Sequence, residues 1–264
     1  MKSIGVFDSG VGGLTVVKEL IRQLPNENII YFGDTARVPY GIKSPETVIR
    51  FSIENILFLL QQDVKLICVA CNTASSLALP VIKNYFRAPI IGVITPGVRE
   101  AVYASQNKRI GVIGTKGTIK SRSYEMEIKQ LDPKVKVVTA PCPLFVPFVE
   151  EGWLSGEVVL RVVKEYLKPL KAAGVDTVIL GCTHYPLLKP VIQQVLGKEV
   201  TLIDSAKQVA CEVKKILASE DLLNCGKGGK NSFFVSDNPE WFSSLAQRFL
   251  GRQLKNVKKV NNVV

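Results

Sequence analysis

The chain has 264 residues, of which 47% are hydrophobic and 22% charged, and its formal net charge is +11 at pH 7. This composition excludes global disorder, and no run approaches the roughly 20 apolar residues that a membrane helix needs. No nucleic-acid motif accompanies the dispersed positive charge, so we expect a mild attraction for anionic ligands and not nucleic-acid binding as the primary role.

Strand-like runs alternate with amphipathic helical stretches along the chain. The runs predicted as strands cover residues 3–7, 28–33, 65–70, 89–94, 109–114, 135–140, 176–181, 200–204 and 232–236. Among the helical stretches, 45–62 has Ser44 as its expected N-cap and Pro45 in its first turn, and 157–173 stops at Gly174. The alternation predicts an α/β fold with mostly parallel sheets flanked by helices.

The chain also repeats itself weakly. Residues 4–10 (IGVFDSG) align with residues 110–116 (IGVIGTK) at an offset of 106, and two cysteine segments align at an offset of 111. Two offsets this similar, in the same order, predict two similar α/β domains that face one another across a cleft. We expect the first domain to contain residues 1–95 and 206–264 and the second to contain residues 96–205.

Two cysteines follow strand-like runs at matching places in the two halves. Cys71 stands in residues 67–75 (ICVACNTAS) and Cys182 in residues 178–186 (VILGCTHYP), where the chain's only histidine, His184, comes two positions later. Function in α/β proteins lies at the carboxyl ends of strands. Each thiol has one predicted titratable helper, Asp8 for Cys71 and His184 for Cys182, and Glu150 is a further candidate in the second half.

Two thiols on opposite sides of one carbon suit stereoinversion by proton transfer. A free thiol has a pKa of about 8.5, so a helper or a helix N-terminus must assist the thiolate that acts as base. Each sulfur should lie within about 3–3.5 Å of the carbon, and so the two sulfurs roughly 7 Å apart, too far for a disulfide. Backbone N–H groups of the 8–13 loop, Asn72, Thr73 and Thr183 are expected to hold a substrate carboxylate.

Other readings of the same residues stay open. Cys68 and Cys71 with Cys182 and His184 could hold a metal, although residues three apart on a strand point to opposite faces. The glycines at 10, 12 and 13 could bind a nucleotide or phosphate, although they fit neither standard fingerprint, or could simply permit a tight turn. Asp8 could instead cap the next helix.

The remaining cysteines are expected to have no catalytic role. We expect Cys68 and Cys211 to be buried as small hydrophobic residues, Cys142 to line the cleft and Cys225 to lie in a loop. Six cysteines, mostly in apolar runs, are typical of reduced thiols in a cytoplasmic enzyme, and Met1–Ser3 leads directly into a strand-like run without a visible secretory leader.

Six segments together resemble the cofactor-independent glutamate racemases, within the wider aspartate/glutamate racemase group. They are residues 7–16 (FDSGVGGLTV), 31–41 (YFGDTARVPYG), 71–75 (CNTAS), 92–97 (GVITPG), 146–150 (VPFVE) and 181–188 (GCTHYPLL). They span nearly the whole chain in the expected order, which makes the set highly specific. His184 separates the chain from aspartate-type relatives, which usually have Cys-Thr-Glu at this place, but a related enzyme acting on aspartate or a similar acid stays the nearest alternative.

The resemblance implies two α/β domains with the active site in the cleft between them. It also implies interconversion of L- and D-glutamate without pyridoxal phosphate, any other cofactor or a metal. It implies that Cys71 deprotonates D-glutamate and Cys182 deprotonates L-glutamate, assisted by Asp8, Glu150 and His184. The implied substrate contacts are Asp8, Ser9, Tyr40, Gly41, Asn72, Thr73, Thr183 and His184. We expect a cytoplasmic homodimer without membrane association, which supplies D-glutamate for bacterial peptidoglycan and thereby serves cell-wall biogenesis and cell shape.

Overall fold

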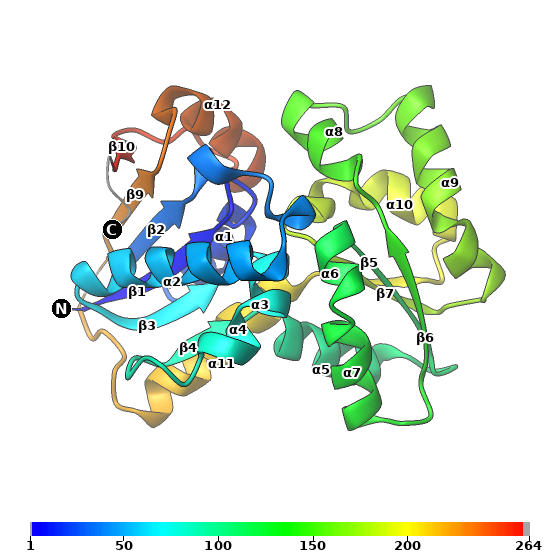
Figure 1. The fold of residues 1–264 in the computed structure, drawn as a ribbon, viewed down its shortest axis with the longest axis horizontal. Coiled ribbons are helices and arrows are strands. Elements are labelled where there is room, and N and C mark those ends of the chain that lie inside the picture. Colours follow the sequence, from blue (N-terminus) through cyan, green and yellow to red (C-terminus); the bar gives the residue numbers. More distant parts are fainter. Residues whose placement is uncertain (1, 227, 261–264) are drawn as a thin grey trace.

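Two parallel sheets form the centres of two α/β domains (Figure 1). The computed structural model describes residues 2–226 and 228–260. The first sheet has the order β10-β9-β2-β1-β3-β4, with β1 (Ser3–Asp8), β2 (Ile29–Gly33), β3 (Val64–Val69), β4 (Ile90–Gly92), β9 (Asn231–Val235) and β10 (Lys258–Lys259). The second has the order β6-β5-β7-β8, with β5 (Arg109–Gly114), β6 (Lys136–Pro141), β7 (Thr177–Gly181) and β8 (Thr201–Ile203).

The nine predicted strands are confirmed, with ends that differ by no more than one or two residues. The two-residue strand β10 was not predicted, because its two lysines have none of the apolar pattern that is typical of a strand. The predicted α/β class with two parallel-sheet domains is also confirmed. The domain boundaries at 95/96 and 205/206 stay a prediction, and the first of these positions lies in the first turn of a helix that begins at Ile94.

Helices cover both faces of each sheet. Those around the first sheet are α1 (Leu14–Gln23), α2 (Pro45–Gln61), α3 (Asn72–Leu77), α4 (Leu79–Ile82), α11 (Ser205–Ser219) and α12 (Pro239–Leu250), with short 3₁₀ helices η1 (Thr35–Arg37) and η2 (Tyr40–Ile42). Those around the second are α5 (Ile94–Ala104), α6 (Lys116–Lys120), α7 (Ser123–Leu131), α8 (Phe145–Glu151), α9 (Glu157–Ala172) and α10 (Lys189–Leu196), with η3 (Tyr185–Leu188). Among the described residues, no helix is long and apolar enough to cross a membrane.

Local chemistry explains where the predicted helices begin and end. The hydroxyl of Ser44 accepts a hydrogen bond from the N–H of Thr47, and Pro45 occupies the first position of α2, as expected. Helix α9 ends at Ala172, just before Gly174, whose φ of 62° suits a residue without a Cβ.

Alternate residues of the central strands face opposite sides of the first sheet. Ile4 and Val6 of β1 pack into a large core that includes α1 and continues into the second domain, whereas Phe7 packs into a smaller core under α2. Because both faces are covered, the inner strands are mostly apolar, as is typical of parallel strands. Polar chemistry is therefore left to the ends of the strands.

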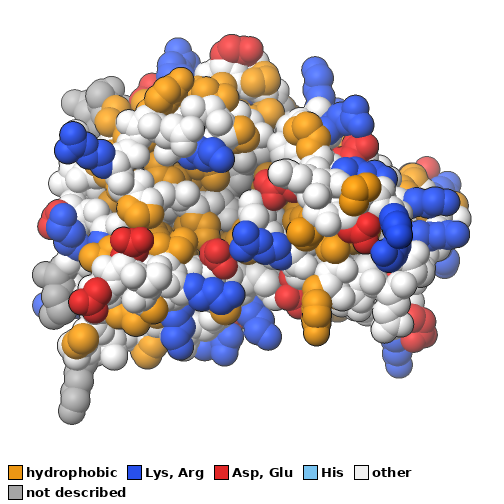
Figure 2. Space-filling view, turned by 90° about the horizontal axis from the view of Figure 1, so that it is seen from below, with side chains coloured by type: hydrophobic (Ala, Val, Ile, Leu, Met, Phe, Trp, Pro, Cys, Tyr) orange, Lys and Arg blue, Asp and Glu red, His pale blue; other side chains and the backbone are white. Residues whose placement is uncertain are grey.

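The basic excess is spread over the surface. Figure 2 shows Lys and Arg side chains on both domains of one face, with acidic and apolar side chains between them. The face in view therefore carries the positive charge in dispersed form, as the sequence indicated.

Candidate active site

A cavity of about 440 Å³ lies at the carboxyl ends of the two sheets, and residues of both domains line it. Its size is typical of small-molecule sites. The predicted site residues that line it are Ser9, Tyr40, Gly41, Cys71, Asn72, Thr73, Glu150, Cys182, Thr183 and His184. Asp8 is not part of the lining, because its side chain is 0% exposed. The fold thus gathers the predicted residues in one place, with Asp8 buried next to them.

Cys182 directly follows β7, and its sulfur lies beside an imidazole–carboxylate pair. His184 Nδ1 is 3.9 Å from Cys182 Sγ, and His184 Nε2 is 2.9 Å from Glu150 Oε1. Burial lowers the pKa of His184, but the contacts with Cys182 and Glu150 outweigh it and raise that pKa to about 10. The trio therefore places an imidazole that can carry a proton directly beside the Cys182 sulfur, which suits proton transfer.

Cys71 lies two residues past β3, at the N-cap of α3. The N–H of Ala74 donates to Cys71 Sγ at 3.5 Å, and the thiol donates to Ser9 Oγ at 3.7 Å. Burial, and after it the nearby Asp8, raise the pKa of the Cys71 thiol to about 12. At neutral pH Cys71 is therefore a neutral thiol that can donate a proton.

Asp8 ends β1, and the loop that follows holds its carboxylate. The N–H of Gly10 donates to Oδ2 at 3.0 Å, Thr183 Oγ1 donates to Oδ1 at 3.5 Å, and the backbone of Gly13 adds a further bond. Burial raises the pKa of Asp8, and His184 and these bonds offset only part of that rise. Helix α1 has Gly13 at its N-cap, so Asp8 does not cap it. The N–H groups of the loop bind the carboxylate of Asp8, whereas those of a phosphate loop bind a ligand.

Gly12 lies where the two domains touch. A Cβ at this position would come within 2.2 Å of Thr183 Oγ1 and 2.6 Å of His184 Nδ1, which is closer than real Cβ contacts. The glycines at 10, 12 and 13 all have negative φ. The close approach of two domains, and not a tight turn, therefore requires glycine at position 12.

Hydroxyl and amide groups from both domains meet at the cavity wall. Thr73 Oγ1 lies 3.0 Å from Thr115 Oγ1 across the domain boundary, and Asn72 Oδ1 accepts a hydrogen bond of 2.6 Å from the hydroxyl of Tyr124. Thr115 and its exposed neighbour Lys116 line the cavity but were not predicted as site residues. The repeat contained the signal for Thr115, because this residue is the counterpart of Ser9 at the offset of 106.

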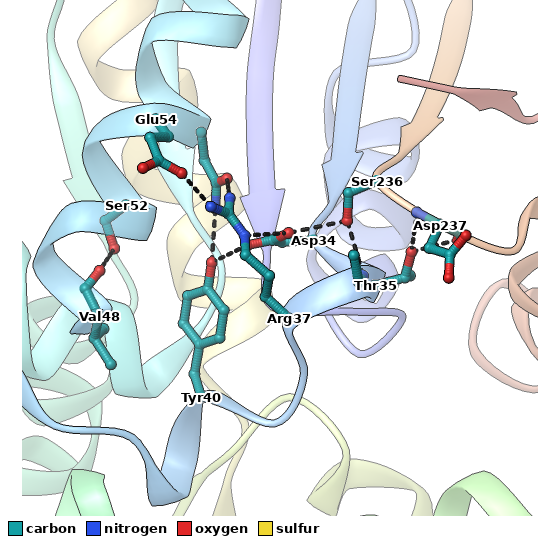
Figure 3. A network of polar contacts seen from close by, with 11 residues as sticks. Asp34, Thr35, Arg37, Tyr40, Val48, Ser52, Glu54, Ser236 and Asp237 are labelled. Atoms are coloured by element: carbon teal, nitrogen blue, oxygen red, sulfur yellow. Dashed lines mark hydrogen bonds and ion pairs between the residues drawn. The ribbon is translucent and has the colours of Figure 1, made fainter. Parts of the chain in front are cut away.

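Tyr40 presents its backbone, and not its hydroxyl, to the cavity. Its hydroxyl donates to Asp34 Oδ2 and accepts a hydrogen bond of 3.0 Å from Asn55. Figure 3 shows Arg37 and Ser236 reaching the same carboxylate, at 2.7 and 2.9 Å. This buried network anchors the Tyr40–Gly41 segment, so a substrate contact here would come from main-chain groups.

The family assignment agrees with this geometry. Residues 4–212 match the family model described as Asp/Glu/hydantoin racemase. The chain belongs to this racemase family. The glutamate racemase of Geobacter metallireducens is 53% identical over 261 residues, which cover 98% of this chain and 97% of that protein. The resemblance noted in the sequence is thereby confirmed.

Solved structures of other family members share the fold. The crystal structure of a glutamate racemase from Bacillus anthracis is 44% identical with a TM-score of 0.96, covering 100% of this chain and 98% of that one. A glutamate racemase from Francisella tularensis, crystallised in complex with D-glutamate, is 41% identical with a TM-score of 0.93, covering 99% and 98% of the two chains. Both matches extend over nearly the whole of this chain.

The other cysteines of this racemase-family chain differ in part from expectation. Cys68 is buried, as predicted, but Cys211 is exposed, so that prediction was wrong. The cause is helical periodicity, because the buried side of α11 carries Val209, Ala210 and Val213 and leaves Cys211 on the outer side.

Cys142 and Cys225 complete the set. Cys142 is fully buried and does not line the cavity, contrary to expectation, and its carbonyl accepts a hydrogen bond of 2.8 Å from the hydroxyl of Tyr185. Cys225 is exposed outside any helix or strand. Cys68 packs in the core on the α1 side and Cys71 in the core on the α2 side, so the two thiols face apart and do not form a chelating pair.

Proposed function

We propose that this chain interconverts L- and D-glutamate by proton transfer between two thiols. The observation that carries the proposal is that Cys71 and Cys182, each just past an inner strand of its own parallel sheet, line one cavity. The weak repeat relates the two halves, so a carbon bound between them is approached by one sulfur on each face. The glutamate racemases of G. metallireducens and F. tularensis support glutamate as the substrate.

In the direction from L- to D-glutamate, Cys182 acts as the base. Its thiolate takes the α-proton and becomes a thiol, while the thiol of Cys71 gives a proton to the opposite face and becomes a thiolate. One C–H bond breaks and one forms, so no net proton is lost from the protein. His184, protonated next to Cys182 and bonded to Glu150, stabilises the starting thiolate.

In the direction from D- to L-glutamate, Cys71 acts as the base. The N–H of Ala74 and the hydroxyl of Ser9 lie within bonding distance of its sulfur and stabilise negative charge there. Asp8 is the proton carrier of this half, because burial raises its pKa and so makes it a better proton acceptor than an exposed aspartate. The two thiols thus use different helpers for the same step.

The substrate carboxylates bind to neutral donors of the cavity wall. Ser9, Asn72, Thr73 and Thr183 supply hydroxyl, amide and backbone N–H groups, and the Tyr40–Gly41 segment adds main-chain groups. Fixed donors of this kind also stabilise the charge that spreads into the α-carboxylate when the α-proton leaves.

This chemistry calls for no metal and no pyridoxal phosphate. We further propose that the protein works as a cytoplasmic homodimer and supplies D-glutamate for peptidoglycan, and hence for cell-wall biogenesis and cell shape. The two domains of the proposed enzyme comprise residues 1–95 with 206–264, and residues 96–205.

The decisive experiment is circular dichroism of the purified protein with L-glutamate in heavy water, without added cofactor. The proposal expects loss of the optical signal and deuterium at the α-carbon of the product. L-Aspartate serves as the control substrate, and its faster racemisation would favour the aspartate-specific alternative. Activity should survive dialysis against a chelator and treatment with hydroxylamine; loss that is restored by a metal or by pyridoxal phosphate would overturn the two-thiol mechanism.

A further inference from the structure

The C-terminal end of helix α12 reaches from the first domain to the second. The helix packs on α1 and next to β9, and in Figure 1 its end faces α8 across the domain boundary. Two consecutive residues at this end, Arg248 and Phe249, contact the part of the second domain that carries Glu150 and His184. Neither was singled out by its sequence.

Arg248 binds the C-terminal end of α8, the helix that carries Glu150. Its Nη1 donates to the carbonyl of Val149 at 3.2 Å and to the carbonyl of Glu150 itself. The last carbonyls of a helix have no partner within the helix, and a cation there also complements the helix dipole. Gly152, with φ of 81°, ends α8 and makes room, because a Cβ would lie 2.9 Å from Arg248 Nη2.

Phe249 fixes the other member of the pair. Its side chain is 2% exposed, and its ring stands edge-on to the imidazole of His184 at a centroid distance of 5.4 Å. A single helix of the first domain, α12, therefore contacts both His184 and the backbone of Glu150 in the second domain. Any opening of the domains at this boundary would release both contacts together.

We propose that Arg248 is a positioning residue for the His184–Glu150 pair, so that contact between α12 and α8 couples domain closure to assembly of the Cys182 half of the site. The proposal rests on the proposed function only for its kinetic consequence. Arg248 binds the backbone of Glu150 and does not touch the cavity, so it acts through Glu150 and not on substrate.

The single histidine of the chain allows a direct test by NMR. Side-chain signals of His184 report its protonation without assignment from other histidines. The titratable groups recorded around the ring are Cys182, Glu150 and Asp8. In Arg248→Met, which keeps length and removes the donors, we expect Glu150 to drift from the ring and the pKa of His184 to fall by at least one unit from its wild-type value.

The kinetic test compares kcat in the two directions. A catalytic group displaced by about 1 Å can lose up to about 100-fold in rate, so we expect Arg248→Met to lower kcat from L to D by roughly 10- to 100-fold. The loss from D to L should be smaller, since the hydrogen bonds of Cys71 and Asp8 go to residues outside α12. Arg248→Lys, which can still donate to a carbonyl, should recover part of the rate. Arg252→Met, which removes an equal charge four residues away, is the matched control.

Each outcome decides the proposal. An unchanged pKa of His184 in Arg248→Met, with equal losses in both directions, would mean that the residue only stabilises the fold, and wild-type kinetics would also overturn the proposal. If Arg248→Met does not fold, Arg248→Lys and Phe249→Leu are compared in the same NMR titration, and a His184 pKa equal to that of the wild type in both would refute it. Because the titration needs no turnover, a shifted pKa in a protein that does not racemise glutamate would refute the proposed function and leave the positioning role in place.

Discussion

Replacing Gly12 by alanine should separate catalysis from folding. The added Cβ would lie 2.2 Å from Thr183 Oγ1 and 2.6 Å from His184 Nδ1, whereas ordinary contact begins at 3.4 Å. Because protein interiors are close-packed, both side chains would have to retreat by roughly 1 Å. Neither is free to do so, since Thr183 is bonded to Asp8 and His184 to Glu150.

The expected magnitude follows from this displacement. Overpacking by one methyl group should lower the free energy of unfolding by about 1–3 kcal/mol. A displacement of this size at the proton relay should lower kcat by roughly 10- to 100-fold in the L-to-D direction. The assays are circular dichroism of glutamate for kcat in each direction and urea titration for stability.

Gly5→Ala is the matched control. Its Cβ would meet Val64 Cγ1 at 3.1 Å and Leu59 Cδ1 at 3.3 Å, in the core and away from the cavity. It should lower stability while leaving kcat near the wild-type value. If Gly12→Ala keeps kcat within twofold of the wild type, or if both variants lose activity only in proportion to stability, the idea that Gly12 sets the position of His184 is wrong.

The remaining predictions concern the titrating groups. Cys71→Ser and Cys182→Ser should each lower racemisation by roughly 10²- to 10⁴-fold in both directions, because an alcohol is a far weaker acid than a thiol, so it donates a proton poorly and is hardly ever ionised to act as the base. Near-normal rates of deuterium incorporation into the inverted product would contradict the two-thiol scheme. Asp8→Asn should lower kcat from D to L more than from L to D. It should also raise the thermal midpoint at pH 7, because the raised pKa of Asp8 means that its buried charge lowers the stability of the fold above the ordinary pKa of 3.8. A lower midpoint would show that the hydrogen bonds of Asp8 outweigh the cost of its burial. Because the pKa of His184 is raised from 6.5 to about 10, its proton stabilises the fold fully below about pH 6.5, and this contribution is lost as the pH rises through 10. In urea titrations, the difference in stability between the wild type and His184→Asn should therefore shrink over that pH window. A constant difference would count against the raised pKa of His184. Limited alkylation followed by mass spectrometry should label the two exposed cysteines first, and glutamate should protect only Cys71 and Cys182; protection of the exposed pair instead would move the binding site elsewhere.

The local part of the site could be predicted from the sequence. An apolar strand followed by a functional residue is a short-range pattern, and it correctly located Cys71, Cys182 and Asp8 at strand ends. The repeat then predicted that these ends face one cavity. What could not be predicted depends on orientation, because the hydroxyl of Tyr40 turns to Asp34 and away from the cavity.

Contacts between segments that are distant in the sequence could not be predicted either. Arg248 lies 98 positions from Glu150 in the chain and binds the main-chain carbonyls of Val149 and Glu150. Because every residue has a carbonyl, the residue types give no indication of these contacts. Gly12 was noted as a turn former, but its actual constraint comes from side chains more than 170 residues away. Such constraints arise only when the domains are docked, so a pattern within one segment does not contain them.

The two cysteines of the cavity have different surroundings, although the chemistry proposed for them is similar. Burial raises the pKa of the Cys71 thiol to about 12, while the contacts with Cys182 and Glu150 raise the pKa of His184 to about 10. In the proposed reaction, this asymmetry suits removal of the α-proton of L-glutamate on the Cys182 side and delivery of a proton from Cys71 on the opposite side. Under the same proposal, Asp8 and His184 are the groups through which the starting protonation states would be restored. A repeat with identical helpers in both halves would lack this asymmetry, so the proposal expects Asp8→Asn and His184→Asn to affect kcat unequally in the two directions of the reversible reaction.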